Sequence, residues 1–176
     1  ELPLEVVTLT ELDITDKVEE TEETFEENAV LKARAYYKMS KLPALADDGG
    51  LEIDYLGGEP GVKSRRWPGY EASDEELIEL ALQKLKGVPR EKRTAWFRVV
   101  IAVALSSQDI RTYSASLEGY IIESPVYPVI KGYPFRSIFY CPEVGGVLAN
   151  FTIEEVHNLH RKRALDQAMP LLKNLK

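Results

Sequence analysis

The stretch that most constrains this chain is Leu45–Ile53, in which two adjacent aspartates separate an apolar run from a glycine pair. Neighbouring side chains on a strand point to opposite faces of the sheet. We therefore expect Asp47 and Asp48 to end a short buried strand, and Gly49-Gly50 to form a tight turn or to admit a ligand close to the backbone. Ligands of α/β proteins usually bind at strand ends, where a carboxylate can hold Mg²⁺ or act as a general base on water. An Asp-Asp-Gly run alone is more often an ordinary acidic turn.

Length and charge narrow the class of protein. The 176 residues fit one domain, residues 1–176, which can contain two lobes and a real core. The net charge of −7 argues against a nucleic-acid polymer as partner, but a small phosphorylated ligand needs only a local cluster of basic residues. The single cysteine, Cys141, cannot form an internal disulfide, so a reducing cytoplasm is the simplest compartment. No stretch has the length of a transmembrane helix, so we expect no membrane partner.

Start signals for helices occur at three places. Thr24 with Glu27 is typical of a capping box, and the helix that follows should run to about Ser40. Its inner side should carry Ala29, Ala33, Tyr36 and Tyr37. Two further capping boxes begin at Ser73 and Thr152. β-Branched and apolar runs predict strands at 4–9, 43–46, 96–105, 110–117 and 119–122.

A basic segment follows a glycine-rich loop. The loop Gly57–Gly61 contains residues suited to special backbone conformations. It delivers a run of basic and polar side chains, Lys63, Ser64, Arg65 and Arg66. Because arginine binds oxygen-rich groups bidentately, this run beside two aspartates suits a nucleotide.

Three motifs together carry a family resemblance. They are Glu20–Ala33, Ala46–Leu51 and Leu56–Arg66. In this order and spacing they resemble the inosine triphosphate pyrophosphatase family, whose pattern reads roughly E-T-G-x-T-F-x-E-N-A-x-x-K-A, A-D-D-S-G-L and L-G-G-x-P-G-x-x-S-A-R. Where that pattern has serine and alanine, this chain has Gly49 and Arg65.

The resemblance implies a fold and an activity. The fold is α/β, with a twisted mixed sheet flanked by helices and two lobes around a central nucleotide cleft. The activity is Mg²⁺-dependent hydrolysis of the non-canonical purine nucleoside triphosphates ITP, dITP and XTP to monophosphate and pyrophosphate. The assembly implied is a homodimer.

The resemblance also implies roles for single residues. Asp48 is the general base, and the metal is held by Glu20, Asp47 and Asp48. Lys32 and Arg66 contact phosphate. The base is bound by four further residues, Tyr133, Phe135, His160 and Arg161. Three of them have a simpler reading: Glu20 as a solvated acid, Lys32 as an exposed helix lysine and Phe135 as a core aromatic.

Departures from the pattern leave alternatives open. The family motif G-F-G-Y/W-D-P-I/C-F becomes Gly132–Phe139, in which Arg136 replaces the acid, and Val156 replaces a lysine further on. Arg136 could take over the role of that lysine or swing to solvent, and we expect weakened discrimination between inosine and ordinary purine triphosphates.

An S/T-x-N-x-x-K phosphate loop that the family carries upstream is not in this chain, and the missing initiator Met favours truncation. The rival hypothesis is a catalytically impaired relative that serves as a nucleotide-binding or dimerisation module, and a third is a hydrolase of a different nucleotide.

Overall fold

The fold is that of a computed structural model, in which residues 4–175 are described. The chain divides into two compact units. Unit 1 comprises the residues up to Asp48, then Val99–Ala115, and those from Arg161 onward. Unit 2 comprises Gly49–Arg98 and Ser116–His160.

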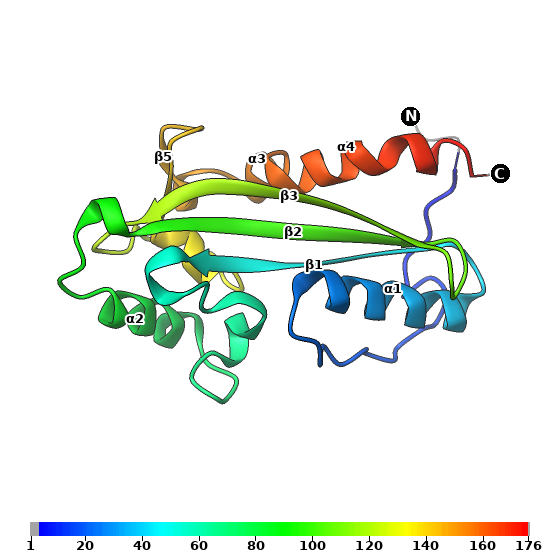
Figure 1. The fold of residues 1–176 in the computed structure, drawn as a ribbon, viewed down its shortest axis with the longest axis horizontal. Coiled ribbons are helices and arrows are strands. Elements are labelled where there is room, and N and C mark those ends of the chain that lie inside the picture. The colour runs from blue at the N-terminus through cyan, green and yellow to red at the C-terminus, as the bar shows by residue number, and fades with distance from the viewer. Residues whose placement is uncertain (1–3, 176) are drawn as a thin grey trace. The chain divides into compact units, whose positions relative to one another are not determined.

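Five strands form one sheet in the order in which they occur along the chain (Figure 1). They are β1 (Ala44–Ile53), β2 (Thr94–Ala104), β3 (Ile110–Ile121), β4 (Phe139–Cys141) and β5 (Gly146–Val147). The pairs β3–β4 and β4–β5 are antiparallel, with Tyr140 opposite both Tyr120 and Val147. The predicted α/β class is confirmed. Within it the described sheet is antiparallel, whereas we expected a mixed one, because sequence-adjacent strands such as β2 and β3 pair directly through a short turn.

In unit 1 the central strand β2 is buried on both faces. Val99, Ile101 and Val103 pack with α4 (His160–Leu172) through its residues Ala164 and Ala168. The alternate positions Ala102 and Ala104 pack with α1 (Phe25–Ser40), whose small residues Ala29 and Ala33 permit close approach. Burial on both faces explains why this strand reads as a nearly continuous apolar run.

Unit 2 has its own core. The helix α2 (Asp74–Lys84) begins with the predicted capping box, in which Ser73 and Glu76 bond each other's backbone. Its apolar side, including Leu77 and Ala81, packs with residues of the sheet such as Leu51, Leu117 and Phe139. The short helix α3 (Ile153–His157) begins with the capping box predicted at Thr152.

The strand β1 corrects our central local prediction. It does not end at the aspartates but continues through Asp47, Asp48 and the glycine pair to Ile53. Two charges fit within one strand because their side chains lie on opposite faces, so Asp48 is buried on the side of Ala46 while Asp47 is half-exposed. At Gly49-Gly50 the alternation of buried positions shifts by one residue, from 46 and 48 to 51 and 53.

Two further strand predictions differ from the structure. The strand predicted at 4–9 is wrong: these residues are irregular, and Val6 is 76% exposed, because no neighbouring strand pairs with them. The strands predicted at 110–117 and 119–122 form one strand, β3. Within residues 4–175 no helix combines the length and apolarity that a membrane crossing needs.

Candidate active site

A lysine between two carboxylates is the centre of the candidate site in unit 1. The Nζ atom of Lys32 lies 2.6 Å from Oε1 of Glu20 and 3.0 Å from Oδ1 of Asp48. Lys32 comes from α1, Asp48 from β1, and Glu20 from the extended segment before α1. The structure therefore brings together three of the predicted site residues, and Lys32 is not an exposed helix lysine, since only 15% of its side chain is accessible.

Asn28 supports this cluster and was missed by the sequence reasoning. It lies one helical turn before Lys32 on the same side of α1 and is buried. Its side-chain amide accepts from the backbone N–H of Glu22 (3.0 Å) and donates to the carbonyl of Glu22 (3.3 Å). Asn28 thus holds the acidic segment against the helix, and its signal was the Glu-Asn-Ala run inside the first motif.

The protonation of the pair follows from its burial. Burial raises the pKa of Asp48, and this outweighs the opposing hydrogen bond and charge of Lys32. Burial alone would lower the pKa of Lys32, but its bonds to Glu20 and Asp48 raise the pKa above the usual lysine value. The lysine is therefore a stable cation, whereas the aspartate accepts a proton more readily than an exposed one.

Asp47 belongs to a different contact. Its Oδ2 atom pairs with Nη1 of Arg161, at the start of α4. Burial lowers the pKa of Arg161, which remains a cation at neutral pH. The two predicted residues Asp47 and Arg161 thus meet each other rather than joining the Lys32 cluster.

Two of the three predicted metal ligands, Glu20 and Asp48, lie close together. No group of three or more acidic, histidine or cysteine side chains suited to a metal is present in residues 4–175. Glu20 and Asp48 converge on one point, the ammonium of Lys32, so a cation is already accommodated between them. Two carboxylates suit Mg²⁺, which commonly takes one or two carboxylates and completes its shell with water and substrate phosphate.

The aromatic residues predicted to bind the base belong to unit 2, and two of them, Tyr133 and Phe135, lie on the loop 132–137, here called the aromatic loop. Tyr133 is 36% exposed and its ring meets the edge of His157 at 6.2 Å. Phe135 is buried and meets Trp67 edge-on, with ring centroids 6.2 Å apart, so this residue of the loop is part of the core. His160 is buried and stacks on Phe97 at 6.1 Å.

Arg136 is buried and hydrogen-bonded to the backbone. It is 3% exposed, which corrects the alternative that it swings to solvent. Its Nη2 atom donates to the carbonyls of Leu148 (2.9 Å), Phe151 (2.6 Å) and Thr152 (3.1 Å). Burial lowers its pKa. The guanidinium therefore ties the aromatic loop to the start of α3.

The second basic segment forms the 3₁₀ segment η2 (Gly61–Arg66), here called the basic turn. Arg66 is exposed on it. Arg65 instead pairs with Asp74 of α2, Nη1 to Oδ1, at 2.7 Å. Sequence reasoning missed Asp74, since nothing in the pattern distinguishes it from the other acids that open α2.

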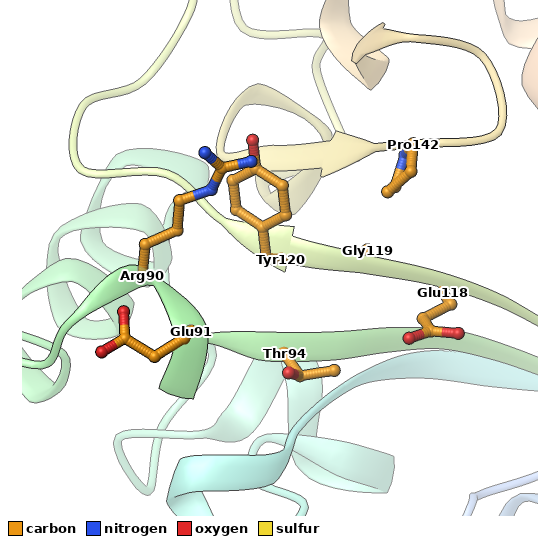
Figure 2. Close-up of a pocket in the computed structure, with 7 residues that line it drawn as sticks. All are labelled: Arg90, Glu91, Thr94, Glu118, Gly119, Tyr120 and Pro142. Atoms are coloured by element: carbon orange, nitrogen blue, oxygen red, sulfur yellow. The ribbon is translucent and has the colours of Figure 1, made fainter.

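A separate hollow of about 410 Å³ lies on unit 2 (Figure 2). At this hollow the guanidinium carbon of Arg90 lies over the ring of Tyr120, 4.4 Å from its centroid, and Glu118 is among the lining residues. None of the predicted site residues lines this hollow.

The sequence model of the Ham1 family matches residues 1–171. The chain belongs to the Ham1 family. This confirms the resemblance inferred from the three motifs.

Two relatives are similar over most of the chain. A dITP/XTP pyrophosphatase of Bacillus subtilis (strain 168) is 40% identical over 169 residues, which are 96% of this chain and 84% of that protein. A dITP/XTP pyrophosphatase of Geobacillus kaustophilus (strain HTA426) is 41% identical over 163 residues, 92% of this chain and 79% of that protein.

Solved Ham1 structures share the fold. A HAM1 protein from Coxiella burnetii superimposes with a TM-score of 0.87 at 35% identity, covering 99% of this chain and 89% of its own. The Staphylococcus aureus Ham1 protein gives a TM-score of 0.84 at 34% identity, with 98% and 88% covered.

Proposed function

We propose that this protein hydrolyses non-canonical purine nucleoside triphosphates, dITP, XTP and ITP, to the monophosphate and pyrophosphate. The observation that carries the proposal is the cluster of Glu20, Lys32 and Asp48, where a buried aspartate with a raised pKa lies beside a fixed cation. The relatives named dITP/XTP pyrophosphatase at about 40% identity support the substrate class.

Asp48 is the general base of this reaction. Its carboxylate removes a proton from water, the water oxygen forms a bond to the α-phosphorus, and the bond from that phosphorus to the bridging oxygen breaks. Pyrophosphate leaves with the bonding electron pair, and Asp48 later releases the proton to solvent. A carboxylate with a raised pKa suits this task, because it holds the proton more firmly than an ordinary aspartate.

Charge on the triphosphate is met by Lys32 and Arg66. Lys32 is already oriented by two carboxylates, so little conformational freedom is lost when it contacts phosphate. Mg²⁺, when bound, neutralises phosphate charge and orients the reacting groups, and Glu20 and Asp48 are the residues that would hold it. Asp47 supports the site from the other face of β1 by holding Arg161.

Base recognition belongs to the aromatic loop and the start of α4. The exposed ring of Tyr133 offers a stacking surface, worth about 1–3 kcal/mol per base. Phe135 fixes the loop to the core, and His160 and Arg161 read the edge of the base. The protein acts in the cytoplasm, consistent with its one buried and unpaired cysteine.

The rival function is binding without hydrolysis. The specific observation in its favour is Arg136, a buried cation at the position where the family pattern has an acid. A protein of this kind would bind dITP but release no pyrophosphate.

Pyrophosphate release from dITP, XTP and ITP tests the proposal. We expect turnover with Mg²⁺, loss of turnover with a chelator, and a decrease of about 10²–10⁴-fold in kcat for Asp48→Asn. Asp109→Asn is the matched control, because Asp109 is a partly exposed aspartate paired with Arg111 in the turn between β2 and β3. Wild-type turnover in Asp48→Asn would disprove the assigned base, and dITP binding with no turnover in the wild type would establish the rival function.

A further inference from the structure

Asp74 connects two segments that the proposed function uses for different parts of the nucleotide. Its Oδ1 atom accepts from Nη1 of Arg65 at 2.7 Å, and its Oδ2 atom accepts from the backbone N–H of Gly132 at 2.7 Å. The Asp74 side chain is only 11% exposed. Both oxygens are therefore engaged, one by the basic turn and the other by the aromatic loop.

Both partners of Asp74 are sequence neighbours of residues that we propose to contact the nucleotide. Arg65 precedes Arg66, the proposed phosphate contact, and Gly132 precedes Tyr133, the proposed stacking surface. Gly132 has a φ of +87°, a conformation that side chains other than glycine rarely adopt. The N–H of Gly132 is thus presented to Asp74 by a backbone shape that the sequence specifies.

A second contact joins the same two segments. Trp67 follows the basic turn directly, and its ring meets Phe135 of the aromatic loop edge-on. The indole N–H of Trp67 donates to Oε2 of Glu59 at 3.2 Å, which fixes the ring. The polar bonds of Asp74 and this aromatic contact together restrain the loop from two sides.

We propose that Asp74 and Arg65 are positioning residues. They hold the aromatic loop and the basic turn at a fixed position relative to each other, so that the binding groups for the base and for the phosphates are in place before the nucleotide binds. The proposal rests on the proposed function. Neither residue contacts the reacting atoms. Arg65 stands where the family pattern has alanine.

The expected effect is on binding rather than on chemistry. A loop that is ordered before the substrate arrives loses less conformational freedom on binding. Without the tie, this cost is added to the binding step, whereas the general base Asp48 is unaffected. The Michaelis constant therefore rises while kcat stays nearly constant.

Steady-state kinetics with dITP on three variants provide the first test. Arg65→Ala and Asp74→Asn should each raise KM about 2- to 10-fold with kcat within about twofold, and Arg65→Lys should recover much of the loss. Asp74→Asn keeps an acceptor for Gly132 and a capable first residue for α2, so folding is preserved. Arg111→Ala is the matched control, since Arg111 pairs with Asp109 at the same 2.7 Å in unit 1. Unchanged KM in Arg65→Ala and Asp74→Asn would overturn the proposal.

Amide hydrogen exchange separates this proposal from the proposed function. Without nucleotide, the aromatic loop and the basic turn should exchange faster in Arg65→Ala than in the wild type, and Arg111→Ala should leave both segments unchanged. Exchange that is the same in Arg65→Ala and wild type would disprove the tie, whatever the activity. If the wild type hydrolyses no triphosphate, faster exchange together with weaker dITP binding in Arg65→Ala would support the positioning role while the proposed hydrolysis fails.

Discussion

At the scale of single residues, the site depends on charges that are buried in pairs. A buried ion is costly unless a partner and hydrogen bonds replace its water. Lys32 meets this requirement with two carboxylates, and Asp48 meets it with Lys32. Arg136 meets it only in part: its Nη2 atom donates to three backbone carbonyls, whereas its buried Nε and Nη1 atoms have no hydrogen-bond partner among the described residues.

The raised pKa of Asp48 predicts how stability depends on pH. Between the ordinary aspartate pKa and the raised one, the folded protein keeps a proton that the unfolded chain has released. The free energy of unfolding should therefore fall as pH rises through this window. In Asp48→Asn this contribution is absent, so with a chelator present the variant should gain stability relative to wild type across the window. Urea unfolding of both proteins at several acidic pH values measures it, and a difference that is constant with pH would contradict the prediction.

Replacing Arg136 by the acid of the family pattern should destabilise the protein rather than restore base selection. The new carboxylate in Arg136→Asp would face the three carbonyls that now accept from the guanidinium, which should cost about 2–4 kcal/mol. Chemical denaturation measures the loss, and Arg163→Ala on α4 is the control substitution of an exposed arginine.

Base selection itself is measured by kcat/KM for ITP, GTP and ATP. We expect weak discrimination in the wild type, and no recovery in Arg136→Asp alone, because Val156 is buried and apolar where the family pattern has lysine. The double change Arg136→Asp with Val156→Lys is the informative comparison. A strong preference for ITP in the unaltered protein would contradict this prediction.

At the scale of elements, close packing between β3 and β4 requires glycine at position 119. Gly119 lies in β3 against β4, and a Cβ atom there would lie 2.3 Å from both the Phe139 ring and the carbonyl oxygen of Tyr140. Phe139 is fully buried and Tyr140 is paired within the sheet, so neither can move aside easily.

Gly119→Ala should therefore lower stability by about 1–3 kcal/mol or more, as overpacking of a core does. The thermal midpoint measures the effect. Glu118→Ala, a change at the adjacent and exposed strand position, serves as control and should unfold close to wild type. Equal midpoints for Gly119→Ala and wild type would show that β4 can yield at this point.

Local signals predicted the elements better than their ends. The capping residues at Thr24, Ser73 and Thr152 all begin helices, because a cap depends on residues three or four positions away. The end of β1 was predicted wrongly, because two adjacent aspartates can continue a strand when tertiary partners, here Lys32 and Arg161, receive them on opposite faces. No local pattern reveals such partners.

At the scale of the whole molecule, sequence separation set the limit of prediction for the site. The family motifs identified Lys32 and Asp48 together, and they do meet. The pairing of Asp47 with Arg161 joins positions 114 residues apart, and that of Asp74 with Gly132 joins positions 58 apart. These pairs follow from the arrangement of the elements and could not be read from spacing.

Assembly is a further prediction at this scale. We propose a homodimer, as the resemblance implies, and light scattering at micromolar concentration should give the mass of two 19.9 kDa chains. Dilution below the dissociation constant should return the mass to that of one chain. A mass near one chain throughout the micromolar range would contradict the prediction.

The shift in β1 at Gly49-Gly50 has a consequence for how this gene can vary. Asp48 and Leu51 are both buried, although they are an odd number of residues apart. Deleting or inserting one residue between them would turn one half of the strand over, exposing either the proposed base or the core side chains beyond it. Substitutions in this stretch should therefore be tolerated better than changes in its length. Serine could replace Gly49, as in the family pattern, whereas an inserted or deleted codon should be eliminated by selection.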